Sequence, residues 1–265
     1  MKWTPEAEAM VKKVPFFVRK KVRERVENEA AAAGKKVVSL VDFQRTQARF
    51  LSKMSSEIKG YQIETCFGPG GCPNPANSAE NLFQKITEIL EKEDLLDFLK
   101  QRVKGDLKFH HEFRVTLAEC PNACSQPQIK DIGIIGAVIP MITREECTLC
   151  EECVETCPEK CVSIDSHAET PAIDLECCLK CGQCIRVCPT GTIGTASKGF
   201  RVQLGGKLGR HPRLASELDG IFSADEVLAI VKQCIKFYKE NSQQGERFAE
   251  LFKNMDVNDI LKSLI

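Results

Sequence analysis

The first forty residues combine apolar positions at helical spacing with residues that begin and end helices. Thr4 can cap a first helix whose first position is Pro5. A second helix is expected from Pro15 to Gly34, because apolar side chains recur at helical intervals between them. Residues 37–41, with the sequence VVSLV, predict a strand. This part of the chain is therefore expected to be a small helical module.

Helices and strands are both expected in the remainder of the chain. Residues 77–90 begin with Asn-x-x-Glu and then carry apolar residues on one helical face, which predicts an amphipathic helix. Residues 114–117 and the apolar run 132–139 predict strands. A Ser-x-x-Glu capping box predicts a helix over residues 223–238, and a helical tail that docks on the rest is expected over about 244–264.

Charge and hydropathy exclude several classes of function. Lysine plus arginine and aspartate plus glutamate both total 37 in 265 residues, so the formal net charge is zero and no overall field attracts nucleic acid or an anionic membrane. The longest nearly apolar stretch, 132–141, has about ten residues, whereas a membrane-spanning helix needs roughly twenty. The N-terminus lacks the apolar stretch of a secretory signal. We expect a soluble, cytoplasmic protein without a membrane span or a nucleic-acid partner.

The 15 cysteines are the most informative feature of the composition. Their number is odd, and the chain is far longer than small disulfide-stabilised domains, so we expect no disulfide framework. Thiolates at short fixed spacings indicate bound metal instead. Four groups have such spacings: Cys66-x5-Cys72, Cys120-x3-Cys124, Cys147-x2-Cys150-x2-Cys153-x3-Cys157 and Cys178-x2-Cys181-x2-Cys184-x3-Cys188. The remaining Cys161, Cys177 and Cys234 are expected to be structural thiols.

The third and fourth groups repeat one pattern, C-x2-C-x2-C-x3-C-P, which ends in Pro158 and Pro189. The pattern is typical of bacterial ferredoxins with two [4Fe-4S] clusters, in which the fourth cysteine of each repeat ligates the other cluster. The crossover predicts two ligand sets: Cys147, Cys150, Cys153 and Cys188, and Cys178, Cys181, Cys184 and Cys157. Two zinc sites are the alternative, but the double spacing and both prolines favour clusters that pass single electrons.

The first two groups are separated by 47 residues, so one metal site built from both would join two distant loops. The spacing alone is compatible with either a third [4Fe-4S] cluster or a zinc site. The flanking sequences ETCFGPGGCP (64–73), AECPNAC (118–124) and KDIGIIG (130–136), with GGKLGRHP (205–212), resemble the siroheme-and-[4Fe-4S] half of sulfite and nitrite reductases over roughly residues 45–250. The resemblance implies a cluster on Cys66, Cys72, Cys120 and Cys124, with Cys124 bridging to the siroheme iron.

Siroheme carries several carboxylates, whose burial requires cationic partners. Cationic side chains gather in and before the glycine-rich segment, and we expect four of them to bind the macrocycle: Arg201, Lys207, Arg210 and Arg213. A solvated basic loop is the alternative.

The expected substrate-binding positions depart from the reductase pattern. Those reductases bind their anionic substrate with a Lys-x-Lys before the third cysteine, whereas this chain has Glu112 and Arg114 there. A carboxylate facing an anion weakens binding unless it is protonated or paired, for example with Arg114 or His111. Arg114 is the candidate for anion binding, and His110 and His111 are candidate proton donors unless they are structural. The sequence therefore does not distinguish a sulfur oxyanion from a nitrogen oxyanion as the substrate.

Residues 3–36 resemble a second family. The sequences WTPEAE and VPFFVRKKVR within them are similar to the small C-terminal helical domain found in the B subunit of light-independent protochlorophyllide reductase. That family reduces a tetrapyrrole, so the resemblance is compatible with a lid over a tetrapyrrole. An interaction or dimerisation element is the alternative.

Together the two resemblances imply an α+β fold with a sulfite-reductase-like mixed sheet, flanking helices and an inserted ferredoxin domain. The expected organisation is a helical module (1–45), the first part of the siroheme domain (46–143), the ferredoxin domain (144–196), the second part of the siroheme domain (197–242) and a helical tail (243–265).

The function implied is a siroheme-[4Fe-4S] oxidoreductase with three [4Fe-4S] clusters that reduces sulfite or nitrite with electrons from an external donor or redox partner protein. Many members of the family place siroheme between two related halves, so a homodimer is expected; a single half that suffices, as in small members of the family, is the alternative. The main alternative is a multi-cluster electron carrier without siroheme, which catalyses nothing itself. Reduction of a tetrapyrrole substrate is a third, weaker option.

Overall fold

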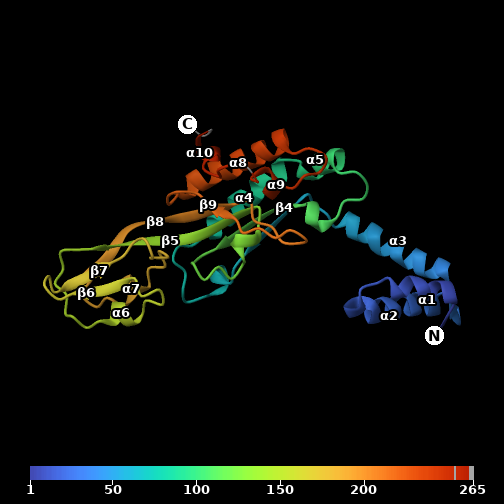
Figure 1. Cartoon of the computed structure of the whole chain (residues 1–265), viewed down its shortest axis with the longest axis horizontal. Helices are drawn as coiled ribbons and strands as arrows, with labels where there is room; N and C mark the ends of the chain where they lie inside the picture. The colour runs from blue at the N-terminus through green and yellow to red at the C-terminus, as the bar shows by residue number, and fades with distance from the viewer. Residues whose placement is uncertain (254, 263–265) are drawn as a thin grey trace. The chain divides into compact units, whose positions relative to one another are not determined.

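The computed structural model describes residues 1–253 and 255–262 (Figure 1). The chain divides into two compact units, Met1–Ile58 with Asp106–Phe109, and Lys59–Gly105 with His110–Ile265.

The first unit consists of three helices and one short pair of strands. Helix α1 spans Pro5–Lys12, α2 spans Phe16–Ala32 and α3 spans Leu40–Ser56, while β1 (Lys2–Trp3) pairs in parallel with β2 (Val37–Val38). Thr4 caps α1 as predicted, since its hydroxyl accepts a hydrogen bond from the N–H of Ala7. The core is built from apolar residues of all three helices and β2: Val11, Val26, Ala30, Val38 and Phe43.

The strand predicted over residues 37–41 is wrong beyond Val38, because a helix begins at Leu40. Ser39 and Asp42 form a reciprocal capping box: the Ser39 hydroxyl accepts from the N–H of Asp42, and the Asp42 carboxylate accepts from the N–H of Ser39. Lys35 donates to the same carboxylate at 2.5 Å. The capping interactions outweigh the strand propensity of the valines on either side.

We expect Asp42→Asn to destabilise the helical unit by about 1 kcal/mol, the usual cost of losing an N-cap interaction. The Lys35 ammonium, followed by the Ser39 hydrogen bonds, lowers the pKa of Asp42 to about 2. A lowered carboxyl pKa contributes stability above the unfolded pKa that is lost as pH falls through the folded value. Wild type should therefore lose this contribution as pH falls from about 4 towards 2, whereas Asp42→Asn should not. The fluorescence of Trp3, the single tryptophan, reports unfolding of this unit; an equal pH dependence in both proteins would contradict the assignment.

The second unit is organised around a five-stranded mixed sheet in the order β3-β4-β5-β8-β9. Its strands are β3 (Tyr61–Thr65), β4 (Phe113–Ala118), β5 (Ile132–Ile142), β8 (Ile193–Leu204) and β9 (Ser216–Glu217). Strands β3, β4 and β5 are mutually parallel, while β8 is antiparallel to β5 and β9. The strands predicted over 114–117 and 132–139 are confirmed, and both extend further than predicted.

The same unit contains three longer helices: α4 (Glu80–Lys92), α5 (Leu95–Arg102) and α8 (Ala224–Asn241). Helix α8 begins at the predicted capping box of Ser223 and Glu226 and packs on β4 through Tyr238, whose ring lies 5.4 Å from that of Phe113. The helix predicted over 77–90 begins later than expected, with Ala79 as its N-cap. No helix among the described residues is long and apolar enough to span a membrane.

The tail after α8 is less helical than predicted. It contains two one-turn helices, α9 (Phe248–Leu251) and α10 (Asp259–Lys262), in place of one long helix. Residue 254 and residues 263–265 of the predicted tail lie outside the described residues. Phe248 and Phe252 are nevertheless buried, so the tail docks as expected.

Strands β5 and β8 form a long antiparallel ribbon, and the chain between them makes a separate small structure at its end (Figure 1). Residues 143–192, called the inserted segment below, contain α6 (Glu152–Glu155), the hairpin of β6 (Val162–Asp165) and β7 (Thr170–Ile173), and α7 (Gln183–Val187). The segment folds back on the ribbon, because the N–H of Val138 in β5 donates to the carbonyl of Lys180 at 2.8 Å. This contact fixes the second cysteine repeat beside the main sheet.

Candidate iron–sulfur site

A cavity of about 630 Å³ lies where the inserted segment meets the ends of β3 and β4. Its walls are mostly apolar, and its most distinctive lining is thiol. Eight cysteines predicted to bind metal line it, four from each side: Cys66, Cys72, Cys120 and Cys124, and Cys157, Cys178, Cys181 and Cys184. Two of the three predicted ligand sets therefore share one hollow.

Parallel strands explain how the two distant cysteine pairs meet. Cys66 directly follows β3, and Cys120 comes two residues after the end of β4. Because β3 and β4 are parallel neighbours, their carboxyl ends lie at the same edge of the sheet, and the N–H of Cys66 donates to the carbonyl of Leu117 at 3.0 Å. Burial raises the pKa of the Cys120 thiol, and the nearby thiols of Cys66, Cys124 and Cys72 raise it further. The structure thus brings the whole predicted set together.

Glu119 ties together the segments around this set, a role that the sequence analysis missed. Its buried carboxylate accepts a hydrogen bond from the N–H of Ala79 at the start of α4 (2.8 Å). Its own N–H donates to Cys66 Sγ at 3.3 Å, and its carbonyl accepts from the N–H groups of Ala76 and Asn77. An acidic residue directly before Cys120, at the end of an apolar strand, was the available signal.

We expect Gly68→Ala to disrupt the proposed cluster on the Cys66 set. A Cβ at residue 68 would lie 2.0 Å from the Glu119 carboxylate, whereas a Cβ at Gly70, in the same turn, would meet nothing within 4 Å. The displaced carboxylate would shift the chain that donates to Cys66. Anaerobically purified Gly68→Ala should contain about four iron atoms fewer per chain than wild type, and Gly70→Ala should be unchanged. Equal iron content in the two variants would contradict the role of Glu119.

The two cysteine repeats of the inserted segment have the same backbone geometry. Leu149 and Lys180, at equivalent places in the repeats, both have positive φ angles (55° and 61°), as do Glu151 and Gly182 (58° and 70°). The N–H of Leu149 donates to Cys147 Sγ, and the N–H of Lys180 donates to Cys178 Sγ, both at 3.4 Å. Such N–H···S bonds are one means by which proteins tune the potential of a cluster.

Some thiols of the two repeats lie close to one another in this segment. Burial raises the pKa of Cys153, and the thiols of Cys150 and Cys188 raise it further. Burial likewise raises the pKa of Cys184 to about 11, with additional contributions from Cys178, Cys181 and Cys157. The fourth cysteine of each repeat is therefore near a thiol of the other repeat: Cys188 is near Cys153, and Cys157 is near Cys184.

The same cysteines bear on the zinc alternative. Four zinc ligands surround a single ion at about 2.3 Å. Among the described residues, no three His, Cys, Asp or Glu side chains are placed to hold one metal ion. The thiols of two of the sets instead line one cavity of about 630 Å³, which has room for polynuclear clusters.

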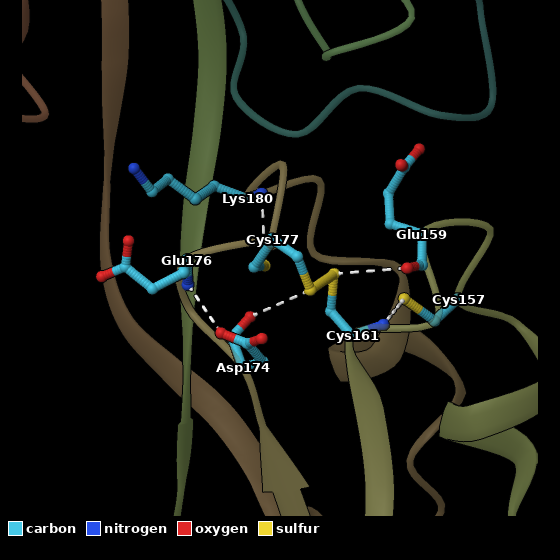
Figure 2. The surroundings of a disulfide bond; sticks show 8 residues. Cys157, Glu159, Cys161, Asp174, Glu176, Cys177 and Lys180 are labelled. Atoms are coloured by element: carbon cyan, nitrogen blue, oxygen red, sulfur yellow. Dashed lines mark hydrogen bonds between the residues drawn. A yellow bond between two sulfur atoms is a disulfide. The ribbon is translucent and has the colours of Figure 1, made fainter.

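The three cysteines outside the predicted sets have two different states. Cys234 is a fully buried free thiol on α8, as predicted. Cys161 and Cys177, also expected to be thiols, form a disulfide with their Cα atoms 5.8 Å apart (Figure 2). The prediction failed because the hairpin of β6 and β7 brings together two cysteines that are 16 positions apart.

None of the four cations predicted to bind siroheme lines the cavity. The Arg201 guanidinium donates to both carboxylate oxygens of Glu217 (2.7 and 2.6 Å), and Lys207 forms an ion pair with Glu250. Arg213 donates to the carbonyl of Ala249 (3.3 Å) and exchanges backbone hydrogen bonds with Lys207, which closes a loop that exposes Arg210. Three of the four are therefore engaged within the chain.

The predicted substrate-binding residues lie at the start of β4, away from the cavity lining. His110 and His111, in the 3-10 turn Phe109–His111, have ring centroids 4.2 Å apart. The N–H of Arg114 donates to Asp131, whose pKa is raised to about 6 by burial in spite of nearby Arg247 and Arg114. Glu112 is buried and accepts from the N–H of Lys59 (2.8 Å) and from Gln62 Nε2 (2.6 Å). Its carboxylate therefore has a structural role at the edge of the sheet.

Two family models match this chain. Residues 59–264 match the nitrite and sulphite reductase 4Fe-4S domain, and residues 3–46 match the proto-chlorophyllide reductase 57 kD subunit. Coenzyme F420-dependent sulfite reductase of Methanocaldococcus jannaschii is 32% identical over 197 residues, which are 73% of this chain and 30% of that protein. The B subunit of light-independent protochlorophyllide reductase from Chlorobium luteolum is 57% identical over 47 residues, which are 18% of this chain and 9% of that protein. Both resemblances in the sequence are confirmed.

The fold has a relative among solved structures. The crystal structure of dissimilatory sulfite reductase I matches with a TM-score of 0.53 at 18% identity, over 82% of this chain and 57% of that one. The predicted mixed sheet with helices is therefore confirmed. The chain spans less than a third of the length of its sulfite reductase relative and about half of this structural neighbour.

Proposed function

Since this chain belongs to the nitrite and sulphite reductase 4Fe-4S domain family, we propose that it is a siroheme-[4Fe-4S] oxidoreductase that reduces a sulfur or nitrogen oxyanion. The family supports an iron–sulfur cluster, and the finer assignment rests on one observation: eight cysteines of two predicted ligand sets line one cavity. Cysteine thiolates are the usual ligands of such clusters.

Three [4Fe-4S] clusters are proposed on the cysteine sets named above. In this assignment the inserted segment is a ferredoxin domain within residues 144–196, between two parts of the siroheme domain at 46–143 and 197–242. When bound, the clusters supply one-electron transfer and siroheme supplies an iron at which an oxyanion binds. The contribution of the chain is to hold the ligands: Glu119 fixes the loop of Cys66, and Val138 fixes the backbone beside Cys181.

The cysteines fit their proposed clusters better than the cations fit siroheme. Cys124, the proposed bridge, is exposed and lines the cavity, so a macrocycle can approach it. Arg210 is exposed as well, but Arg201 and Lys207 are already paired with carboxylates of the chain. Binding of siroheme carboxylates by these two residues would require them to exchange partners.

The partners follow from the same proposal. Sulfite or nitrite would be the substrate, with Arg114, His110 and His111 as candidates for binding it and supplying protons. Electrons would come from an external donor. Because many members of the reductase family place siroheme between two related halves, we propose that a second copy completes the site, and that the helical module at 1–45 is a lid or a dimerisation element.

Anaerobic purification followed by an absorption spectrum and an iron count tests this function. The expected result is siroheme bands with about thirteen iron atoms per chain, from three cubanes and one macrocycle. Sulfite and nitrite assays with a reduced dye then distinguish the substrates. About twelve iron atoms without siroheme bands, in a cell that makes siroheme, would contradict the reductase.

That second result would support a different function, an electron carrier with three clusters and no siroheme. The ion pairs of Arg201 with Glu217 and of Lys207 with Glu250 favour this candidate, because they neutralise two of the charges that siroheme needs. Such a protein would pass electrons to another protein and show no activity with sulfite or nitrite.

A further inference from the structure

The Cys161–Cys177 disulfide lies at the base of the β6–β7 hairpin. In this hairpin Val162 pairs with Ile173, and the N–H of Asp174 donates to the carbonyl of Cys161 at 2.8 Å. The strands thereby place Cys161 opposite the loop that carries Cys177, with a Cα separation of 5.8 Å, which is within the span of a disulfide. The bond closes the loop that leads into the second cysteine repeat.

Both cysteines of the disulfide adjoin ligands of one proposed cluster. The N–H of Cys161 donates to Cys157 Sγ at 3.3 Å, as Figure 2 shows. Cys177 is the residue directly before Cys178, whose sulfur accepts from the N–H of Lys180. Cys161 also lines the cavity that holds Cys157, Cys178, Cys181 and Cys184. The disulfide is therefore part of the wall of the proposed cluster site.

Backbone carbonyl groups near the two sulfur atoms can accept hydrogen bonds from the thiols that reduction of the disulfide would form. The carbonyl of Glu159 lies 3.6 Å from Cys161 Sγ, and the carbonyl of Asp174 lies 3.6 Å from Cys177 Sγ (Figure 2). Each thiol formed by reduction would thus have an acceptor for its S–H proton without movement of the backbone. Cys161 is buried, whereas Cys177 is exposed, so protons can reach the pair from solvent.

We propose that Cys161 and Cys177 are a two-electron dithiol–disulfide site that exchanges electrons with the cluster proposed on Cys157, Cys178, Cys181 and Cys184. In reduction the S–S bond breaks and two S–H bonds form, with two electrons delivered singly through the adjacent cluster and two protons taken from water. The electrons originate from the external one-electron donor, which is oxidised. The pair serves as a reservoir beside one-electron centres. The inference rests on the proposed function for its cluster.

Thiol trapping on the intact protein tests this site. The full chain, purified anaerobically, is oxidised, analysed for iron and labile sulfide, and then reduced stepwise with a one-electron photoreductant. Samples are quenched into denaturant with N-ethylmaleimide, and the labelled cysteines are identified by mass spectrometry. We expect Cys161 and Cys177 to be unlabelled in the oxidised protein and labelled together as the clusters are reduced, while Cys234 is labelled at every step.

Electron counting provides a second measurement. Cys161→Ser/Cys177→Ser should take up two electrons fewer per chain than wild type, whereas the control Cys234→Ala, outside the cavity, should lose none. Labelling of Cys161 and Cys177 in the oxidised protein would overturn the inference, as would a pair that stays unlabelled after the clusters are fully reduced. A chain without cluster iron would instead contradict the proposed function, and with it the electron source of the pair.

Discussion

Cys120→Ser is expected to reduce the proposed turnover of sulfite or nitrite by at least about a hundred-fold. Changes to residues that only support a metal ligand already cost about 10–100-fold in metal affinity or activity, and Cys120 is itself a proposed ligand. It is also the thiol of its set whose pKa responds to the other three, which places it among Cys66, Cys72 and Cys124. A serine hydroxyl is a much poorer ligand of cluster iron than a cysteine thiolate.

The loss should be confined to one cluster. Cys120 belongs to the loop after β4, whereas the other proposed ligand sets belong to the inserted segment, so iron should fall by about four atoms per chain and not to zero. Siroheme should be lost too, because its proposed bridge, Cys124, is part of the damaged loop. Cys234→Ala is the matched control: it removes a buried thiol from α8, which does not line the cavity. Full activity in Cys120→Ser, or equal iron loss in the control, would contradict the ligand assignment.

The sequence predicts most of the grouping of the cysteines, because the ligands of such clusters recur at characteristic short spacings. The tandem repeat of residues 147–188 needs no knowledge of the fold, since each group of three ligands lies within one turn-rich loop. The set of Cys66 and Cys120 is different, because its two pairs meet only through the parallel pairing of β3 with β4. That pairing leaves no local signal, and only the resemblance to the reductases implied one cluster on both pairs.

Long-range pairings account for most of what the sequence analysis missed. The Cys161–Cys177 disulfide depends on the register of a hairpin, and the Lys207–Glu250 ion pair joins residues 43 positions apart. Basic residues in a glycine-rich segment predict a need for anionic partners, but not whether a ligand or the chain itself supplies them. The missed helix α3 is different, since Ser39 and Asp42 form a capping box that is visible in the sequence.

Lys207→Met is expected to destabilise the docking of the C-terminal tail by about 2 kcal/mol. Lys207 is buried beside the glycine-rich loop, and its ammonium pairs with Glu250 of α9. Removing one partner of a fully buried pair costs about 3–5 kcal/mol, because the other charge is left without a counter-ion. The cost here is smaller because Glu250 keeps a second ion pair, with Lys253 at 2.5 Å. Hydrogen bonds from Lys207 and Lys253 lower the pKa of Glu250, so the carboxylate is charged at neutral pH.

Urea unfolding followed by circular dichroism measures the loss, and hydrogen exchange of the amides in α9 shows whether it arises at the tail. In Lys207→Met/Glu250→Gln no carboxylate remains that has lost Lys207, so the double variant should be more stable than Lys207→Met. Equal stability of the two variants would mean that the Glu250 carboxylate carries no penalty once Lys207 is absent.

The siroheme content of Lys207→Met and of Glu250→Gln alone tests whether Lys207 also binds the proposed siroheme. Glu250→Gln leaves the Lys207 ammonium free for a siroheme carboxylate, so it should retain siroheme, whereas Lys207→Met should lose it. Loss of siroheme in both variants to the same extent would show that docking of the tail, and not the Lys207 charge, controls siroheme binding. Retention in both would remove Lys207 from the proposed siroheme site and leave Arg210, the exposed cation of the loop, as the first residue to replace.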